Sequence, residues 1–419
     1  MEWTWGTTRV VCGDGALGEL ATRLGTPSAQ SDSGSDSGSG SGTDSDSAAT
    51  IGLFTGGSAM QRQGILAAVI EALGGLGTVH SFEGLPPNPE PRHVDEAADF
   101  IRAKRPGTVV ALGGGSVIDA VKVANCAAGS DADALSLLHR EQATRARAAP
   151  RFVAVPTTAG TGSEVTPFAT IWDTDAGRKL SLDTPLNLPD LAILDPRVTV
   201  GMPPALTAQT AADALGHAVE SLWSRRRSPL SEALSFAALD RIRRALPGVG
   251  NEPTDIAARR LMLEGSSLAG MAIGLTRSAA AHAISYGITL RHGVPHGLAV
   301  ACLLPSLLRA SLSALPEHVV DRLTTVLAAF EGDIKGEIKD QINDDTADSL
   351  ADRLAASLQR TLACHGMLPA PASVTWSTEQ IEELVAASDV PSRLDNSVVV
   401  PDGEQIRAML AGLRSQSGG

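Results

Sequence analysis

One aspartate and three histidines in the second half of the chain have the spacing of a metal site. Asp213 and His217 are four residues apart in AADALGHAVES, and His282 and His296 follow in AHAISYGITLRHGVPHG. Residues four apart on a helix lie on one face, so Asp213 and His217 can both point at one ion. Three imidazole nitrogens and one carboxylate oxygen suit Fe²⁺ or Zn²⁺, and they suit Ca²⁺ or Mg²⁺ poorly. The alternative is that the four side chains make separate caps or hydrogen bonds.

A glycine-rich turn follows an apolar run and opens a helical pattern in GGGSVIDAVK, residues 113–122. Glycines let the backbone approach a phosphate closely, and the unpaired amides at a helix start can donate hydrogen bonds to it. We therefore expect Gly114, Gly115 and Ser116 to contact a pyrophosphate. The segment is neither a G-x-G-x-x-G pattern nor a Walker A loop, so a simple tight turn is the alternative.

A second loop of this kind is PTTAGTGSEVTPFATI, residues 156–171. Four of its hydroxyl side chains could bind a nucleotide: Thr157, Thr158, Thr161 and Ser163. The alternative is a plain connection in which these hydroxyls cap the next element. Both loops follow predicted parallel strands, and open α/β folds bind ligands at the carboxyl edge of their sheet. The two loops together with the metal pattern therefore predict a cleft for a nucleotide and a metal ion.

Strand and helix patterns alternate over the first half of the chain. Apolar runs predict strands at 50–57, 78–82, 108–115, 152–158, 168–172 and 191–195. Amphipathic patterns predict helices at 15–25, 61–73, 93–104 and 116–128. Continuous β-branched runs that alternate with helices indicate a parallel, Rossmann-like sheet covered on both faces.

The strand pattern stops after MPPAL at 202–206. From there the sequence predicts helices alone, near 207–224, 230–245, 253–274, 278–290, 297–313, 315–330, 347–363, 377–387 and 403–414. We therefore expect an α/β domain at 1–198 and an all-helical domain at 199–419. A chain of 419 residues is long enough to give each domain its own core.

Charge and composition narrow the range of partners. A net charge of −13 argues against nucleic acid or an anionic membrane as a partner. No secretory leader is visible at the N-terminus, and no stretch reaches about 18 uninterrupted apolar residues, so no membrane span is expected. The four cysteines are scattered without a CxxC pair, as in proteins of a reducing compartment. These observations predict a cytoplasmic protein that acts on small molecules.

Residues 26–49 form a low-complexity tract of Ser, Asp and Gly. Such a tract cannot bury enough apolar surface to offset the entropy lost on ordering, so we expect a disordered loop. A predicted helix lies before it and a predicted strand after it, which indicates an insertion within the α/β domain. The alternative is that the tract marks a protein whose function is to interact with a partner.

Four segments, in this order, resemble the iron-dependent (group III) alcohol dehydrogenases: GGGSVIDAVK, PTTAGTGSEVTPFATI, DALGHAVES and HAISYGITLRHGVPHGLAVA. FEGLPPNP at 82–89 and LDP at 194–196 are similar to further parts of that pattern. The resemblance implies a dinucleotide-binding α/β domain and a helical metal-binding domain, as in the dehydroquinate synthase-like fold, with the active site between them. It also implies a homodimer. It places the metal ligands on Asp213, His217, His282 and His296.

The family resemblance also implies a nicotinamide dinucleotide held by residues from several loops. These are Gly56, Gly57, Ser58, Asn88, Gly114, Gly115, Ser116, Asp119, Thr157, Thr158, Thr161, Ser163, Thr166 and Lys179. An acidic residue at the end of the first strand would bind the adenosine ribose hydroxyls and repel a 2′-phosphate. The segment FTGGSAM at 54–60 has no acidic residue, so we expect NADPH to be preferred over NADH.

The segment HAISYG departs from many members of the family, because Tyr286 stands where they carry a further histidine. Together with the PHG histidine, it resembles the branch that reduces phosphonoacetaldehyde to 2-hydroxyethylphosphonate in phosphonate antibiotic pathways. A phosphonate dianion favours guanidinium and ammonium partners, and the candidates are Arg277, Arg291 and Lys179. The alternative is that these three side chains are only solvated at the protein surface.

The reaction implied is the reduction of an aldehyde to a primary alcohol by a reduced nicotinamide, with the metal as a Lewis acid. Tyr286, His292 or a water would supply the proton. Within the family, the alternatives are reduction of maleylacetate, of succinic semialdehyde to 4-hydroxybutyrate, or of simple aldehydes. A sugar-phosphate cyclase of the same fold and a non-catalytic binding protein are the alternatives outside it.

Overall fold

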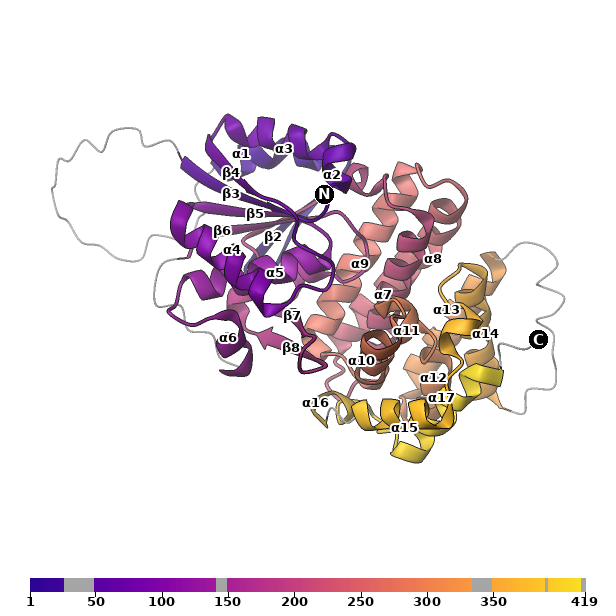
Figure 1. Cartoon of the computed structure of the whole chain (residues 1–419). Coiled ribbons are helices and arrows are strands. Elements are labelled where there is room, and N and C mark those ends of the chain that lie inside the picture. Colours follow the sequence, from indigo (N-terminus) through magenta and orange to yellow (C-terminus); the bar gives the residue numbers. More distant parts are fainter. Residues whose placement is uncertain (26–48, 141–148, 334–348, 389–390, 416–419) are drawn as a thin grey trace, which may run out of the picture.

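A computed structural model of the protein describes residues 1–25, 49–140, 149–333, 349–388 and 391–415 (Figure 1). The tract at 26–49 lies outside the described residues except for Ala49, so the loop expected there stays a prediction. Ala49 itself begins a strand of the central sheet.

Within the described ranges, a seven-stranded sheet forms the centre of the N-terminal half, in the order β1-β2-β9-β6-β5-β3-β4. The strands are β1 (Glu2–Trp5), β2 (Thr8–Cys12), β3 (Ala49–Thr55), β4 (Gly77–Phe82), β5 (Thr108–Gly113), β6 (Arg151–Pro156) and β9 (Leu191–Leu194). β1 pairs antiparallel with β2, and the other neighbours pair in parallel. The expected parallel sheet is confirmed, with an edge hairpin that was not expected.

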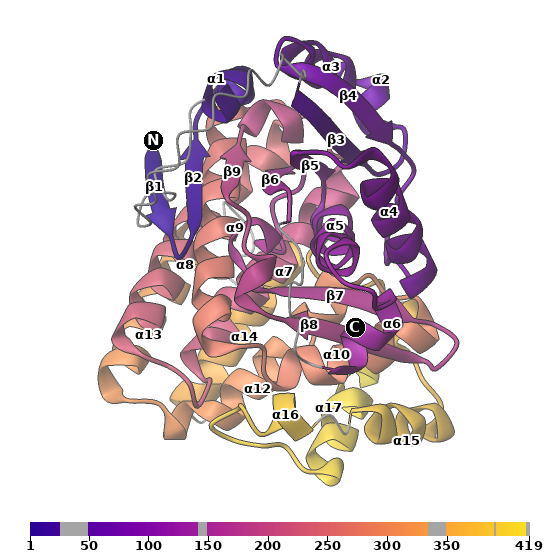
Figure 2. The same cartoon turned by 90° about the vertical axis from the view of Figure 1, so that its left-hand side faces the viewer.

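Helices cover both faces of this sheet (Figures 1 and 2). They are α1 (Leu20–Gly25), α3 (Ile65–Gly74), α4 (Pro91–Lys104) and α5 (Gly115–Ala128). In β5, Val110 and Leu112 pack with α1 and α3, while Val109 and Ala111 pack with α4 and α5. Successive side chains of a strand point to opposite faces, so a strand that is apolar throughout is buried on both sides.

Two strands lie outside the main sheet, which corrects the expectation for 168–172. β7 (Phe168–Asp173) pairs antiparallel with β8 (Arg178–Asp183), a strand that the sequence pattern did not indicate. The short connection between them can join only antiparallel strands, because a parallel pair needs a long crossover. Apolar side chains of the hairpin, among them Ile171 and Leu182, pack in the same cluster as α5.

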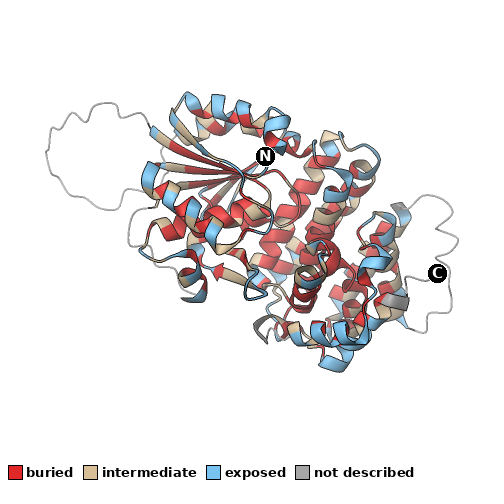
Figure 3. Cartoon of the chain, in the orientation of Figure 1, coloured by how far each residue is buried: buried red, intermediate tan, exposed pale blue. Residues whose placement is uncertain are grey.

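The C-terminal half is built of helices in its described residues. They are α7 (Pro204–Leu222), α8 (Pro229–Asn251), α9 (Ile256–Thr276), α10 (Ala280–His292), α11 (His296–Ala301), α12 (Leu304–Ser311), α13 (Glu317–Asp333), α14 (Leu350–Cys364), α15 (Thr378–Ala387), α16 (Pro391–Leu394) and α17 (Gly403–Ser415). Most residues of α7, α9, α10 and α11 are buried (Figure 3). The α/β half followed by a helical half is confirmed, and the domain boundary at 198 stays a prediction.

Two expected helices are each divided. The helix expected at 61–73 consists of α2 (Ala59–Arg62) and α3, which are separated by Gly64 with a φ of 73°. The helix expected at 297–313 consists of α11 and α12, because the ring of Pro305 at the start of α12 has no N–H to continue the ladder of hydrogen bonds. The helices α6 (Ala134–Arg140) and α16 were not expected.

Among the described residues, one segment is long and apolar enough to cross a membrane. His296–Ala314 has a mean hydropathy of 1.5, and 67% of it is buried inside the molecule. It consists mainly of α11 and α12, which pack into the helical core. Its burial is that of a segment packed within the protein.

The two halves touch where the loop after β6 meets α9. Gly162 has a φ of 61°, and a Cβ added to it would lie 2.5 Å from the Cα of Gly270. A Cβ added to Gly270 would lie 2.7 Å from the Cα of Gly162. The second glycine-rich loop therefore rests directly on the backbone of α9, and neither position has room for a side chain.

This contact predicts opposite effects for two glycines of α9. Gly270→Ala should lower the free energy of unfolding by about 1–3 kcal/mol, because the added methyl group forces the loop and α9 apart. Gly274→Ala is the matched control: the nearest atom to its added Cβ lies at 3.7 Å. It should be neutral or stabilise by up to ~1 kcal/mol, since alanine favours helix. Urea unfolding of both variants measures the difference, and equal stabilities would contradict the close contact.

Candidate metal and dinucleotide site

Three imidazoles approach a single carboxylate oxygen in the helical half. The Nε2 atoms of His217, His282 and His296 lie 3.8, 3.7 and 3.9 Å from Oδ1 of Asp213. Asp213 and His217 come from consecutive turns of α7, His282 from α10 and His296 from α11. Donors bonded to one tetrahedral metal ion at about 2.1 Å lie about 3.4 Å apart, so the three distances to Asp213 are only slightly longer than in such a site.

Glu220, one turn after His217 on α7, fixes the orientation of His282. Its carboxylate accepts a 2.7 Å hydrogen bond from Nδ1 of His282 and backbone hydrogen bonds from Ala279 and Ala281 at the start of α10. With Nδ1 protonated, Nε2 of His282 carries its lone pair toward Asp213. A carboxylate behind a histidine is the usual partner of a metal ligand.

The polar atoms that face one another in this cluster lack protein partners. Within the described part of the chain, buried Oδ1 of Asp213 and buried Nε2 of His282 have no hydrogen-bond partner. Buried polar atoms are normally paired, so an orphaned acceptor beside an orphaned lone pair indicates a place for a cation. The ligand atoms of Asp213, His217 and His282 all lie within 4.8 Å of one another. The residues present therefore fit a divalent metal ion.

A close backbone contact brings His296 into the cluster. A Cβ added to the next residue, Gly297, would lie 2.0 Å from the carbonyl oxygen of Gln209 on α7. Only glycine therefore allows the start of α11 to lie this close to Asp213. The Nδ1 atom of His296 is 3.4 Å from Oγ of Ser285, which leaves Nε2 to face the cluster.

Burial and the neighbouring charges decide the protonation of the cluster. Burial alone would raise the pKa of Asp213, but the three imidazoles, His217 first, hold that pKa below its usual range. Burial lowers the pKa of His217 to about 4 and that of His296 well below its ordinary value. Burial opposes protonation of His282 as well, yet Glu220 and Asp213 raise its pKa to about 9. Without an ion, the cluster therefore offers one anionic oxygen and the neutral imidazoles of His217 and His296, while His282 holds a proton that a divalent cation would displace on binding.

Two cavities of similar size meet beside this cluster. One has a volume of about 490 Å³ and the other about 460 Å³. The residues that line both are Asp119, Thr161, Thr170, Lys179, Asp213 and His296. The candidate metal cluster therefore lies at the junction of the two cavities.

The second cavity lies along the carboxyl ends of β3, β5 and β6. Most of the expected cofactor residues line it: Gly56, Gly57, Asn88, Gly114, Gly115, Ser116, Asp119, Thr157, Thr158, Thr161 and Lys179. Ser58 is not among the residues that line it, and its hydroxyl accepts a hydrogen bond from Arg62 on α2. Ser163 and Thr166 line the first cavity instead.

Asp119 ties the two glycine-rich loops together. Its carboxylate accepts hydrogen bonds from the Ser163 hydroxyl at 2.5 Å and from the Thr170 backbone at 2.8 Å. Burial raises the pKa of Asp119, although Lys122 and these hydrogen bonds oppose that rise. Asp119 therefore positions the second loop as well as lining both cavities.

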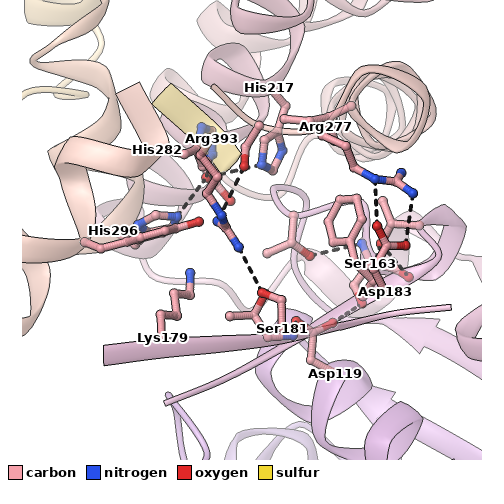
Figure 4. A pocket seen from close by; sticks show the side chains of 18 of the residues that line it. Asp119, Ser163, Lys179, Ser181, Asp183, His217, Arg277, His282, His296 and Arg393 are labelled. Carbon is pink, nitrogen blue, oxygen red and sulfur yellow. Dashed lines mark hydrogen bonds and ion pairs between the residues drawn. The ribbon is translucent and has the colours of Figure 1, made fainter. Parts of the chain in front are cut away.

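The first cavity contains the cluster, Tyr286 and several basic side chains (Figure 4). The Tyr286 ring stacks on the His296 ring with centroids 5.6 Å apart. Lys179 lies beside Tyr286, and burial together with the Arg393 guanidinium lowers the pKa of Lys179 to about 7. Arg277 lines the cavity too, where it is paired with Asp183 at 2.8 Å.

Two expected residues lie elsewhere. Arg291 is exposed on α10 and pairs with Glu383 at 3.4 Å. The His292 ring lies against Trp376, with centroids 5.4 Å apart. Neither residue lines either cavity. Both are at the C-terminal end of α10, three or more residues past Tyr286, where the helix has turned away from the cavity.

Two residues of the site did not follow from the sequence pattern. Glu220 is seven residues after Asp213, so the helical period that linked Asp213 to His217 could also have indicated Glu220. Arg393 lines the first cavity from α16, more than 90 residues after the last metal candidate. No periodicity connects Arg393 to the site, and only the tertiary structure reveals it.

The fold and the site define a class of protein: an α/β half whose ligand cavity meets a histidine-rich cation site on a helical half. Residues 35–196 match the model of the iron-containing alcohol dehydrogenases, and residues 207–403 match the model of the C-terminal part of that family. The chain belongs to the iron-containing alcohol dehydrogenase family.

The chain is similar to named relatives over part of their length. It is 41% identical over 224 residues to a phosphonoacetaldehyde reductase of Streptomyces viridochromogenes, covering 52% of this chain and 57% of that protein. It is 36% identical over 253 residues to a probable alcohol dehydrogenase of Salmonella typhimurium, covering 60% of this chain and 63% of that protein. The matched segments thus span less than two thirds of either relative.

A solved structure matches over nearly the whole chain. It is that of a sulfoacetaldehyde reductase from Bifidobacterium kashiwanohense in complex with NAD⁺. The TM-score is 0.77 and the identity is 26%, and the match covers 99% of this chain and 98% of that one. The likeness extends through both halves of the fold.

The support that Glu220 gives His282 predicts a measurable effect on metal binding. Glu220→Gln keeps the size of the side chain but removes its charge, so affinity for Fe²⁺ or Zn²⁺ should fall by ~10- to 100-fold. His217→Ala should abolish stoichiometric binding. Metal titration and elemental analysis measure both effects. The control is Glu383→Gln at the exposed pair with Arg291, and an equal loss there would contradict a specific role for Glu220.

Proposed function

We propose that the protein catalyses the metal-dependent reduction of an aldehyde to a primary alcohol by NADPH or NADH. The observation that carries this proposal is the junction at Asp213 and His296. There a cavity lined by the glycine-rich loops opens onto a cavity that contains the cation cluster. A dinucleotide bound along the glycine-rich loops would present its nicotinamide ring beside a substrate held at the cation cluster.

The ligands we propose for Fe²⁺, or alternatively Zn²⁺, are Asp213, His217, His282 and His296. When bound, the metal ion supplies Lewis acidity and the reduced nicotinamide supplies the reducing electrons. The protein orients both against the substrate, which converts an encounter of three species into a reaction within one complex. The proposed proton donor is the Tyr286 hydroxyl, since Tyr286 lines the cavity and stacks on His296.

The substrate we propose is phosphonoacetaldehyde, which places the protein in phosphonate biosynthesis. Two observations support it: the 41% identity to a phosphonoacetaldehyde reductase, and the basic side chains Lys179 and Arg393 along the substrate cavity. A reductase of uncharged aldehydes is the second candidate, favoured by the 36% identity to a probable alcohol dehydrogenase. The cytoplasmic location and the homodimer stay predictions.

The cofactor we propose is NADPH in preference to NADH. Gly57 follows β3 at the edge of the dinucleotide cavity and carries no acidic group. Arg62 reaches back to the Ser58 hydroxyl, so a positive charge lies beside this edge. A 2′-phosphate on the adenosine ribose would meet a cation there and no carboxylate.

The proposed substrate predicts the outcome of a substrate panel. With Fe²⁺ and NADPH, phosphonoacetaldehyde should exceed propionaldehyde, succinic semialdehyde and maleylacetate in kcat/KM by about tenfold or more. Propionaldehyde lacks a hydrogen bond to a charged group, which contributes about 1.5–3 kcal/mol. The two carboxylate substrates have a charged group, but a phosphonate dianion offers more charge and a third oxygen to the basic side chains. Oxidation of NADPH is followed by its absorbance. A higher kcat/KM for propionaldehyde would support the second candidate instead.

The proposed cofactor preference predicts the effect of a carboxylate at residue 57. No atom lies within 4 Å of a Cβ added to Gly57, so Gly57→Asp should fit without disturbing the fold. Its charge should repel the 2′-phosphate and shift the NADPH-to-NADH ratio of kcat/KM toward NADH by about 100-fold. Gly57→Asn is the uncharged control. A wild-type protein that already prefers NADH would refute the proposal.

A further inference from the structure

The substrate cavity contains two basic side chains that have no acidic partner. Of its four basic residues, Arg277 is paired with Asp183, and Arg226 is exposed at the rim. Lys179 and Arg393 are less exposed, and no carboxylate in the described residues lies within ion-pair distance of either. The cavity also has the carboxylates Asp119, Asp183 and Asp213, but none is within ion-pair distance of these two cations. Partly buried cations are normally paired, so Lys179 and Arg393 are available to bind an anionic ligand.

These two cations gather around one aromatic ring. The Nζ atom of Lys179 lies 4.5 Å from the Tyr286 ring centroid, and the Arg393 guanidinium carbon lies 4.7 Å from it. In Figure 4 their side chains project into the same space as His296. Both charges lie within 4.7 Å of one ring centroid, and like charges this near the same ring repel each other in a partly buried site. An anion between them would remove that repulsion.

Hydroxyl groups complete the surroundings of Arg393. Its guanidinium donates to Oγ of Ser181 at 2.9 Å and to Oγ of Ser278 at 3.4 Å. A guanidinium has five N–H donors in a planar fork, so these two bonds orient Arg393 and leave other donors for a ligand. The Ser181 and Ser278 hydroxyls also line the cavity.

The position of the pair relative to the metal cluster sets the size of the ligand. Both cations contact the Tyr286 ring, and that ring lies 5.6 Å from the His296 ring. The cations and the cluster therefore both contact the Tyr286 ring or its neighbour His296, so a short ligand can contact both. A two-carbon aldehyde with a charged group is such a ligand.

We propose that Arg393 and Lys179 form the subsite for a tetrahedral oxyanion on a two-carbon aldehyde, with Arg393 as the residue that determines specificity for the charged group. The inference rests on the proposed function and adds the residues that select its substrate. Two cations favour a phosphonate dianion over a sulfonate monoanion, and a guanidinium can bind two phosphonate oxygens at once. Arg277 and Arg291 are outside the subsite, because each already has a carboxylate partner.

Steady-state kinetics of three variants test the subsite. Arg393→Leu should reduce the kcat/KM ratio of phosphonoacetaldehyde to propionaldehyde by about 100-fold, since it removes a charged donor from the anion. Arg393→Lys keeps one charge but loses the fork, and it should retain an intermediate ratio. Arg291→Leu is the matched control on the surface and should keep the wild-type ratio. An unchanged ratio in Arg393→Leu would overturn the proposal.

Binding without turnover separates this inference from the proposed reaction. With saturating NADP⁺ present to fill the phosphate-binding loops, methylphosphonate should raise the Tm of the wild-type protein, and methanesulfonate should raise it less. Arg393→Leu should abolish the shift and Arg291→Leu should retain it. Absence of a shift in the wild type, or an equal shift in Arg393→Leu, would overturn the subsite. If the Fe²⁺-loaded wild type reduces no aldehyde while methylphosphonate still binds through Arg393, the proposed reaction fails and the subsite stands.

Discussion

The approach of three imidazoles to one oxygen of Asp213 is the constraint on which the helical half depends. Four buried polar side chains would be costly without compensation, so the surrounding helices must hold them to within tenths of an ångström. Small residues make this possible: α7 is rich in alanine, and Gly297 lets α11 approach the backbone of α7. Glu220 adds the orientation, because one carboxylate binds both the His282 ring and the start of α10.

The same constraint gives the α/β half its orientation toward the site. The loop after β6 rests on α9 through Gly162 and Gly270, which brings the carboxyl edge of the sheet up to the cluster. Asp119 then holds the second loop and β7 in place through Ser163 and Thr170. The two cavities share residues for this reason, and the candidate metal cluster lies where they meet.

Local periodicity accounts for what could be predicted from the sequence. Apolar runs alternating with helical patterns revealed the parallel sheet, and the spacing of Asp213 and His217 revealed one face of α7. The β7–β8 hairpin was missed because strand 168–172 is apolar enough to resemble a member of the main sheet, and β8 is mostly polar. Only the short turn between them determines the pairing.

Residues that come from distant segments could not be predicted in this way. Arg393 is carried by a four-residue helix with no pattern of its own, and its role follows from contact with Ser181 and Tyr286. Arg291 and His292 show the opposite error: they were expected at the site because they are close to Tyr286 in the sequence, but they lie elsewhere. One further turn of α10 points their side chains toward Glu383 and Trp376 instead.

The distribution of the four candidate ligands over α7, α10 and α11 has a consequence for folding. An ion held by all four would act as a cross-link between segments more than 60 residues apart in the chain, with the entropic advantage of closing a long loop. Loading with metal and cohesion of the helical core are then thermodynamically linked. A chelator that removed such an ion would loosen the helical scaffold itself.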